Sequence, residues 1–414
     1  MLMGIIKKPS IGMYWSKNPV CSTPIYSQTM NRSRYEAMLR FLHFSDNSKC
    51  PPRDNPQYDN LYKICPPISH FNSQFDSMYT PQKNICVDES LMKYKGRLGF
   101  KQYIPAKRSR YGIKLYKLCE SASGYVYTFR VYEGKDSHLD PPGCPDIIGT
   151  SGKIVWDLIN PLLNKGYHLF IDNYYNSIPL LRMLYCFETV ACGTIRKTRV
   201  GFPKALAQKK LKRGETAALC QDELLALKFK DKKEVFMLTS MHTEHTRRVA
   251  VRGRQETRRV PVCIRQYNNH MGGVDLSDQL LQPYLILRKT RAWYKKLGIY
   301  LMQMATRNAF ILYKKANADL KSTFLDFQFQ LISGLLTECH SGEPSAGPSS
   351  RKVETGHFCF RIPPTPKKKT PQKRCRLCYQ RGVRTETSFY CPDCPSQPGL
   401  CIGNCFKEFH TQGE

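Results

Sequence analysis

The 414-residue sequence predicts an α/β core that is flanked by helices and followed by a small cysteine-rich module. Three observations predict this architecture. Short runs of β-branched and aromatic residues alternate with helical patterns between residues 84 and 187, which is typical of an α/β core. The last 40 residues hold six of the 18 cysteines. The net charge of +31 indicates a surface that collects polyanions such as nucleic acid.

The composition excludes several other classes of protein. Hydrophobic residues make up 41% of the chain and aromatic residues 11%, which is too much for a disordered protein. No apolar run approaches the roughly 18 residues that cross a membrane, and the apolar stretch at the N-terminus is too short for a signal peptide. Cysteines before residue 375 are scattered without paired spacing, as in an intracellular protein with reduced thiols.

The first 84 residues contain one clear helical pattern. Apolar side chains at Tyr35, Met38, Leu39 and Leu42 follow the spacing of one helical face and predict a helix over 32–44. Prolines then follow at positions 51, 52, 56, 66 and 67, where we expect regular elements to be broken. The chain starts apolar and without a capping residue, so we expect it to begin inside a domain.

Strands and helices alternate from residue 85 onward. Their β-branched and aromatic content predicts strands over 85–88, 111–119, 125–132 and 168–172, with a further strand within 227–240. Helical spacing predicts helices over 154–163, 177–187, 274–281 and 293–316. Ser177 is the expected N-cap of the second of these helices, with Pro179 in its first turn.

Two strongly basic stretches interrupt this core. Eight lysines and arginines and no acid lie between residues 196 and 213, and six arginines with one acid lie between residues 247 and 259. Positive charge of this density binds the phosphate backbone of DNA. Arg247 and Arg248 are therefore candidate DNA-binding residues.

Four aspartates are the candidate catalytic residues. Asp88 and Asp172 each end an apolar run that is predicted to be a buried strand, where a carboxylate is costly unless it is paired or metal-bound. Asp275 and Asp278 are three residues apart and share one face of a predicted helix. Plainer roles exist for all four: Asp88 and Asp172 as turn or capping residues, and the helical pair as compensation for the helix dipole.

Taken together, these acids predict one negative site within a positive surface. Hard oxygen ligands suit Mg²⁺ or Mn²⁺. Two such ions roughly 3.5–4 Å apart activate a water or a 3′-hydroxyl and stabilise the leaving oxygen in phosphodiester transfer. We therefore predict Mg²⁺ (or Mn²⁺) bound by Asp88, Asp172 and Asp275, with DNA held by the basic surface.

The segments that contain these acids resemble a known family. ICVDESL, YIPAKRSRYGIKLY, FIDNYYNS, YNNHMGGVDLSDQL and the tryptophan of RKTRAWYKK, in that order, are similar to motifs of the piggyBac transposases and their domesticated relatives. The resemblance implies an RNase H-like core of the DDE/D type that excises and reinserts DNA at TTAA sites. It implies that Asp88, Asp172 and Asp275 are the active-site aspartates and that Asp278 is a fourth.

The resemblance also implies a domain order, a homodimer, a nuclear location and double-stranded DNA with transposon terminal repeats as the partner. Family members carry a further N-terminal region, so we expect the chain to begin inside the helical domain. The expected parts are a partial helical dimerisation and DNA-binding domain (1–84), the RNase H-like core (85–198 and 262–284), a β-rich basic insertion (199–261), a second helical part (285–340), a flexible basic linker (341–372) and a zinc-binding domain (373–414).

Trp293 lies among cations near the end of the core. A tryptophan in such a position stacks on an unpaired base or anchors a helix to the core. By its position it matches the family's tryptophan near the active site, so DNA contact is the favoured role. The expected DNA-binding residues here are Trp293, Arg288, Lys289 and Arg291.

The C-terminal cysteines have the spacing of zinc ligands. Cysteines separated by two residues present two thiolates to one tetrahedral zinc, and about 40 residues with few core-forming side chains need a metal to fold. The spacing leaves open whether two sites are sequential or interleaved, and the resemblance favours an interleaved cross-brace that recognises transposon-end DNA. The expected Zn²⁺ ligands are Cys375, Cys378, Cys391, Cys394, Cys401, Cys405, His410 and, as an eighth, His357.

Two functions from different classes remain. The four aspartates favour an enzyme, a DNA transposase that cleaves and transfers strands. A short N-terminus favours a domesticated DNA-binding protein that no longer cuts. A zinc-dependent ubiquitin ligase, suggested by the cysteine pairs alone, explains neither the charge nor the aspartate motifs.

Overall fold

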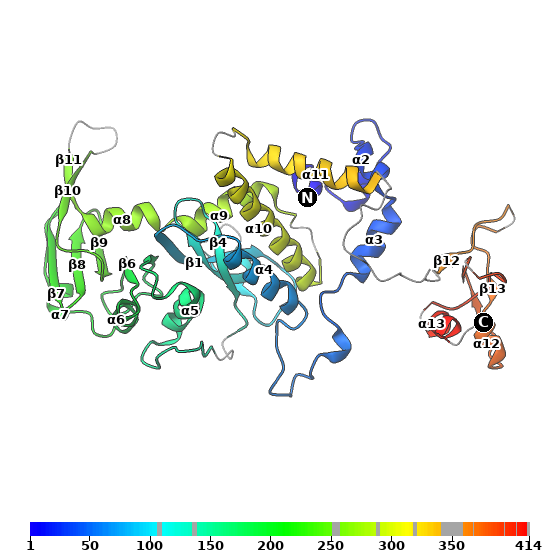
Figure 1. Cartoon of the computed structure of the whole chain (residues 1–414), viewed down its shortest axis with the longest axis horizontal. Coiled ribbons are helices and arrows are strands. Elements are labelled where there is room, and N and C mark those ends of the chain that lie inside the picture. The colour runs from blue at the N-terminus through cyan, green and yellow to red at the C-terminus, as the bar shows by residue number, and fades with distance from the viewer. Residues whose placement is uncertain are drawn as a thin grey trace. The chain divides into compact units, whose positions relative to one another are not determined.

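The computed structural model describes residues 1–105, 110–134, 139–250, 257–286, 290–317, 321–340, 359–366, 368–392, 394–402 and 404–411. The chain divides into two compact units, residues 1–340 and 341–414, and each is described by itself (Figure 1). Within these ranges, no helix combines the length and apolar character needed to cross a membrane.

The core of the first unit is a nine-stranded sheet. Its strands run in the order β3-β1-β5-β6-β9-β8-β7, with β2 and β4 both paired to β3. β1 is antiparallel to β3 but parallel to β5, which is in turn parallel to β6. This arrangement confirms the predicted RNase H-like fold. The strands are β1 (Asn84–Lys93), β2 (Gln102–Tyr103), β3 (Tyr111–Glu120), β4 (Val126–Val131), β5 (His168–Ile171), β6 (Val190–Thr194), β7 (Thr216–Gln221), β8 (Leu224–Lys230) and β9 (Glu234–Thr239).

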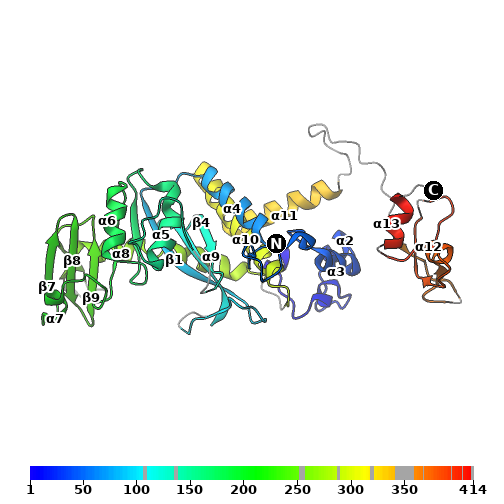
Figure 2. The ribbon, with the colours of Figure 1, turned by 90° about the horizontal axis from the view of Figure 1, so that it is seen from below.

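Helices cover both faces of this sheet. α5 (Thr150–Ile159) and α6 (Ile178–Cys186) share an apolar core with Val87 and Ile171 on one face. The core on the other face contains Cys86 and Phe170 together with the second set of helices, α4 (Cys65–Ser77), α8 (Val262–His270), α9 (Gly273–Leu281) and α10 (Trp293–Ala316). Side chains alternate between the faces of a strand, so Asp88 belongs to the face of Cys86. α4 and α10 lie side by side in both views (Figures 1 and 2).

Several elements match the sequence predictions. α10 spans residues 293–316 as predicted. Ser177 caps α6, because its hydroxyl accepts a hydrogen bond from the amide of Leu180. α3 (Arg32–Phe41) fills most of the predicted 32–44 helix and is capped by Asn31.

Other elements differ from the predictions. Pro66 and Pro67 do not break regular structure but lie in the first turn of α4, where a missing N–H costs nothing. β1 continues past Asp88 to Lys93, so Asp88 lies within a strand and not at its end. α5 begins at Thr150, before the predicted start at 154, and Pro161 lies in the 3₁₀ turn that follows (Asn160–Leu162).

The basic insertion extends the main sheet. β9 pairs antiparallel with β6, so β7, β8 and β9 continue the sheet of the core (Figure 1). A separate hairpin of β10 (Thr246–Ala250) and β11 (Thr257–Pro261) follows and leads into α8. The short helix α7 (Lys204–Gln208) precedes β7.

The N-terminal segment packs next to α10. Lys7 Nζ donates a hydrogen bond to the carbonyl oxygen of Pro283 at 2.6 Å, and Met3 and Tyr14 share an apolar cluster with Ile286. The remaining helical elements of this unit are α1 (Leu2–Ile5), α2 (Pro24–Thr29), α11 (Phe324–His340) and the 3₁₀ turns Ile11–Trp15, Asn47–Lys49 and Gln282–Tyr284.

The second unit is small and built around its cysteines. Its buried cluster contains Leu377, Leu400 and Phe409 together with four buried cysteines. Two short antiparallel pairs join β12 (Phe360–Arg361) to β15 (Phe389–Tyr390) and β13 (Lys373–Arg374) to β14 (Glu386–Thr387), and the helices are α12 (Arg376–Gln380) and α13 (Asn404–Thr411).

Candidate functional site

The register of the sheet places Asp88 and Asp172 at neighbouring positions. Val87 of β1 is the partner of Ile171 in the parallel strand β5, and each is followed directly by one of the aspartates. On the other side of β1, Asp88 is the partner of Lys117 in β3. The parallel pairing of β1 with β5 ends at Val87 and Ile171, and such ends are where α/β sheets place their binding sites. Two acids and a lysine therefore lie in a row across β5, β1 and β3.

α9 carries the other two acids and packs directly on β1 and β3. This packing requires glycine at two points. A Cβ at Gly273 would lie 2.8 Å from the Sγ of Cys86, and a Cβ at Gly124 would lie 3.0 Å from a backbone nitrogen of α9. Gly124 also has a φ of +70°, which other residues rarely adopt. Asp275 is exposed in the first turn of α9, and Asp278 is half-buried one turn later.

A buried lysine holds Asp278. The Lys117 side chain is 0% exposed, and its Nζ donates to Asp278 Oδ1 and to the hydroxyl of Tyr300, each at 2.8 Å. The hydroxyl of Ser90 donates to the same Asp278 oxygen at 2.9 Å. We name these four residues the Lys117 cluster. Burial alone would lower the pKa of Lys117, but the attraction of Asp278 and Tyr300 raises it, so the ammonium stays charged.

The surroundings raise the pKa of Asp172 above its ordinary value. Burial raises its pKa, and the nearby carboxylate of Glu89 raises it further. The amide of Tyr174 acts in the opposite direction by donating to Asp172 Oδ1 at 2.8 Å. That hydrogen bond is the turn-capping role expected of such an aspartate. Glu89 accepts a hydrogen bond from the Tyr175 hydroxyl at 3.2 Å.

The donor set of the aspartates fits a hard divalent cation. Carboxylate oxygens of Asp88, Asp172 and Asp275 are the ligands that Mg²⁺ and Mn²⁺ prefer. Across the described ranges, each group of three or more ligand atoms within 4.8 Å of one another belongs to the C-terminal unit. Within the same ranges, the carboxylate oxygens of Asp88, Asp172 and Asp275 do not form such a group. In a site with two metal ions, the three aspartates need not all bind the same ion.

The C-terminal cysteines form two interleaved ligand groups. Each group has its ligand atoms within 4.8 Å of one another, and the groups are Cys375, Cys378, Cys401 and Cys405, then Cys391, Cys394 and His410. The first cysteine pair therefore joins the third, whereas the second pair joins His410. This is a cross-brace, and the sequential arrangement is not formed. The first group is a complete Cys₄ set for zinc. His357, the expected eighth ligand, lies outside the described residues.

The orientation of His410 fits metal binding. Its Nδ1 lies 2.7 Å from the carbonyl oxygen of Phe406, and its Nε2 lies 3.2 Å from the Sγ of Cys394. A carbonyl accepts only from a protonated nitrogen, so the proton is on Nδ1 and Nε2 faces the cysteines. In the other group, burial disfavours the thiolate of Cys375. Hydrogen bonds from the amides and the thiols of Cys378 and Cys401 together outweigh burial and lower the pKa of Cys375 to about 7.

The described DNA-binding candidates lie on different elements. Arg247 and Arg248 are exposed on β10 of the hairpin. Arg291 is exposed just before α10, and its carbonyl oxygen accepts from the Tyr94 hydroxyl at 2.7 Å. Arg288 and Lys289 lie outside the described residues.

Trp293 begins α10 and packs on the core. It is half-buried, with its ring edge-to-face against Phe100 at a centroid distance of 5.3 Å. This contact corresponds to the anchoring role weighed for it from the sequence. The neighbouring Lys296 is buried, and its pKa is lowered by burial and by Lys93.

Sequence reasoning missed two charged residues of β3. Lys117 lies inside this apolar strand and Glu120 is its last residue, and both have 0% exposed side chains. Glu120 accepts from Tyr79 at 2.6 Å and from Lys315 at 3.1 Å, which joins the sheet to the end of α10. A signal was present: a strand with this much apolar sequence is buried on both faces, so any charge within it needs a partner.

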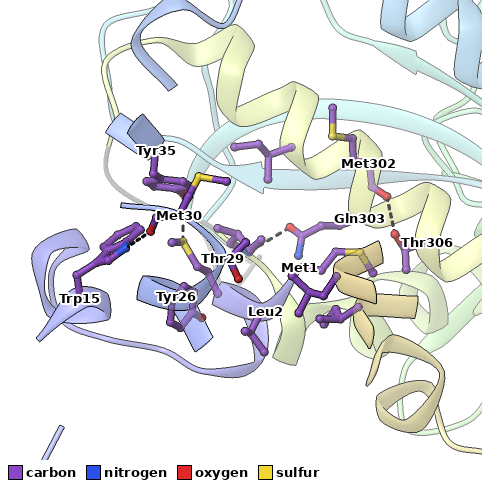
Figure 3. A pocket seen from close by; sticks show the side chains of 15 residues that line it. Met1, Leu2, Trp15, Tyr26, Thr29, Met30, Tyr35, Met302, Gln303 and Thr306 are labelled. Atoms are coloured by element: carbon purple, nitrogen blue, oxygen red, sulfur yellow. Dashed lines mark hydrogen bonds between the residues drawn. The ribbon is translucent and has the colours of Figure 1, made fainter. Parts of the chain in front are cut away.

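The structure also contains an apolar pocket, and none of the four candidate aspartates lines it. It has a volume of about 420 Å³ and is formed where the N-terminal segment meets α10 and α11. Figure 3 shows Trp15 and Tyr35 on one side of it and Met302, Gln303 and Thr306 on the other. Among the described residues, no charged side chain lines it.

Comparisons with known proteins agree with this geometry. Residues 1–310 match the family described as Transposase IS4, and residues 364–411 match a DDE_Tnp_1-like zinc finger. The class is therefore a DDE-type transposase domain followed by a zinc finger. The fold is similar to that of piggyBac transposase in a cryo-EM structure of its synaptic complex with hairpin DNA. The TM-score is 0.71 at 22% identity, and the match covers 95% of this chain and 86% of that chain.

Two human proteins are also similar to this chain in sequence. PiggyBac transposable element-derived protein 3 from Homo sapiens is 26% identical over 428 residues, covering 99% of this chain and 68% of that protein. PiggyBac transposable element-derived protein 2, also from Homo sapiens, is 26% identical over 441 residues, covering 100% of this chain and 69% of that protein. The chain belongs to the piggyBac transposase family.

Proposed function

We propose that the chain is a metal-dependent DNA transposase that cleaves and transfers strands at TTAA sites. The observation that carries this proposal is the register pair Val87–Ile171, which sets Asp88 and Asp172 at neighbouring positions of two parallel strands. α9, which carries Asp275, packs on the first of these strands. Membership of the piggyBac family supports the same reaction class.

In this proposal Asp88, Asp172 and Asp275 hold Mg²⁺ or Mn²⁺. The bound cation supplies the activation of a water or 3′-hydroxyl and the stabilisation of the leaving oxygen. Two of the ligands come from a buried sheet, which fixes their separation, and the third comes from a helix packed on that sheet. Asp172 has a raised pKa, so its charged form, and with it cation binding, is favoured as the pH rises.

Double-stranded DNA that carries transposon terminal repeats is the proposed partner. The proposed contacts come from Arg247 and Arg248 of the hairpin and from the segment before α10, with Arg288, Lys289, Arg291 and Trp293. Cations on exposed strands neutralise phosphates and release counterions, which favours binding at low salt. The two zinc sites would hold the C-terminal unit in the shape that reads the repeats. A homodimer and a nuclear location belong to the same proposal.

A domesticated DNA-binding protein without cleavage is the second candidate. It is favoured by the two human relatives, whose names describe them as transposable element-derived. Both candidates predict DNA binding, so only the reaction separates them.

Strand cleavage tests the proposal. The purified chain is incubated with a duplex that carries the inverted repeats flanking its gene next to TTAA, in Mg²⁺ and in EDTA. Nicks at the repeat ends that require Mg²⁺, and disappear when the repeats are scrambled, support the transposase. Tight binding of the same duplex without nicks in either Mg²⁺ or Mn²⁺ supports the domesticated protein.

A further inference from the structure

We propose that Lys117 is a positioning residue that neutralises Asp278, so that Asp278 is not a metal ligand and Asp88, Asp172 and Asp275 make up the ligand set. The inference rests on the proposed function for the identity of the site, and it changes the role of one of its four aspartates. It arises from the Lys117 cluster, which no sequence motif indicated.

The contact between the two charges is direct and enclosed. Lys117 Nζ lies 2.8 Å from Asp278 Oδ1, and the lysine side chain is 0% exposed whereas that of Asp278 is 32% exposed. The same oxygen also accepts from Ser90 at 2.9 Å. Charge-assisted hydrogen bonds of this kind are about twice as strong as neutral ones. Two donors therefore already occupy the Asp278 oxygen that faces the sheet.

The position of the ammonium decides what Asp278 can do. The Lys117 ammonium is in direct contact with the Asp278 carboxylate, at 2.8 Å. A divalent cation bound to Asp278 would be close to this ammonium, and like charges repel strongly where water is excluded. The carboxylate of Asp278 therefore forms an ion pair with Lys117, and the cation binds to Asp88, Asp172 and Asp275.

The cluster also fixes the helix that carries Asp275. Lys117 belongs to β3, Ser90 to β1, Asp278 to α9 and Tyr300 to α10, so four elements meet at one group of hydrogen bonds. Asp275 lies one turn before Asp278 on the same helix. The ion pair thereby helps to hold α9 on the sheet, whereas the close approach at Gly273 sets the position of the helix turn that carries Asp275.

Three full-length variants test this inference: Lys117→Met, Asp278→Asn and the double variant. Asparagine keeps an oxygen that accepts from Ser90, and methionine keeps most of the lysine volume. Asp278→Asn leaves a buried ammonium without its partner, so its thermal unfolding midpoint should fall sharply. The double variant removes both charges and should recover most of that midpoint, which is the signature of a coupled pair.

Mn²⁺ affinity is the second measurement, because it distinguishes a residue that binds the metal ion from one that only stabilises the fold. It is measured by electron paramagnetic resonance on protein whose cysteine sites are loaded with Zn²⁺. We expect the double variant to bind Mn²⁺ within about twofold of the wild type, whereas Asp88→Asn loses at least tenfold. An exposed pair, Arg32 and Glu36, gives the matched control: Arg32→Met with Glu36→Gln should show no coupling.

Two results would overturn the inference. A folded double variant that loses Mn²⁺ as severely as Asp88→Asn makes Asp278 a metal ligand. Additive effects of the two single variants on the unfolding midpoint mean that Lys117 does not hold Asp278. Wild-type protein that does not bind Mn²⁺ contradicts the proposed function instead, and the thermal coupling then decides by itself whether Lys117 is the partner of Asp278.

Discussion

Val87 of β1 lies opposite Ile171 of the parallel strand β5, and each of these residues is followed by an aspartate. A shift of one residue in either strand would turn one of the two aspartates to the other face of the sheet, because side chains alternate. The candidate site therefore depends on the pairing register of two buried strands as much as on the acids themselves.

Gly273→Ala should disturb the site without changing a charge. The new Cβ would lie 2.8 Å from the Cys86 Sγ and 2.9 Å from the carbonyl oxygen of Glu120. Such overpacking costs about 1–3 kcal/mol of unfolding free energy, and it pushes α9 and Asp275 away from the sheet. Urea unfolding and Mn²⁺ titration should show both losses.

The matched control is Gly334→Ala in α11, where a Cβ would meet nothing within 4 Å. In an exposed helix this change should stabilise the protein by about 0.5–1 kcal/mol. Unchanged stability and Mn²⁺ affinity in Gly273→Ala would contradict the close packing of α9.

Glu120 predicts a pH dependence of stability. Burial alone would raise its pKa, but hydrogen bonds from Ser123, Tyr79, the amide of Gln82 and Lys315 together outweigh it and hold the pKa below the ordinary 4.5. The stability that the ionised carboxylate contributes is then complete above pH 4.5 and is lost as the pH falls through the lowered pKa.

Glu120→Gln removes that contribution. Its unfolding free energy at neutral pH should fall by about 3 kcal/mol, and it should change less than that of the wild type as the pH is lowered through the acid range. Glu36→Gln, which removes an exposed acid, is the control and should follow the wild type. Parallel curves for Glu120→Gln and the wild type would mean that Glu120 does not titrate as described.

The sequence identifies the acids and most of the elements around them, because these depend on local patterns. The apolar run before Asp172 predicts β5, and the spacing of Asp275 and Asp278 predicts one face of α9. The prolines at 66 and 67 misled the prediction, since proline breaks a helix interior but is favoured in a first turn.

What the sequence cannot indicate is pairing between distant segments. The partner of Lys117 lies 161 residues away on α9, and no local pattern specifies which helix covers which strand. The spacing of the cysteines does not specify their grouping for the same reason, because sequential and interleaved arrangements use the same spacing. The family resemblance favours the interleaved arrangement, and the ligand groups confirm it. Register, ion pairing and ligand grouping all arise from tertiary packing.

The interleaved cysteine groups predict which double variants lose which metal. Cys378 and Cys405 belong to one group, whereas Cys394 belongs to the other. Cys378→Ser with Cys405→Ser should lose about one of two zinc ions per chain, because both changes damage the same site. Cys378→Ser with Cys394→Ser should lose both. Elemental analysis of the purified full chain measures this.

The exposed Cys220 gives the control, since Cys220→Ser should keep the wild-type zinc content. A sequential arrangement would reverse the pattern for the two double variants. That reversal would refute the cross-brace.

The β10–β11 hairpin predicts a salt effect on DNA binding. Arg247 and Arg248 are exposed, so Arg247→Ala with Arg248→Ala should remove up to two phosphate contacts. The slope of log affinity against log salt should then become shallower by roughly 2. Fluorescence anisotropy with a labelled duplex at several salt concentrations measures the slope.

Lys232→Ala with Lys233→Ala removes the same charge from another exposed turn, between β8 and β9, and is the matched control. A smaller change of slope in this control is expected. Equal changes in both variants would show that the hairpin contributes only net charge.

We propose that Asp88 of β1, Asp172 directly after β5 and Asp275 of α9 act in strand cleavage and not in DNA binding. Asp172→Asn removes one negative charge and nearly keeps the side-chain shape, so its DNA affinity should equal or exceed that of the wild type. Asp157→Asn is the control, because Asp157 lies on α5, away from the site, and pairs with Arg130.

Cleavage of a duplex with terminal repeats and a TTAA flank in Mg²⁺, measured beside the affinity for the same duplex, is the most direct test. We expect Asp172→Asn to bind the duplex and not to cut it, whereas Asp157→Asn binds and cuts like the wild type. Cleavage by Asp172→Asn at the wild-type rate would show that Asp172 has no part in the reaction.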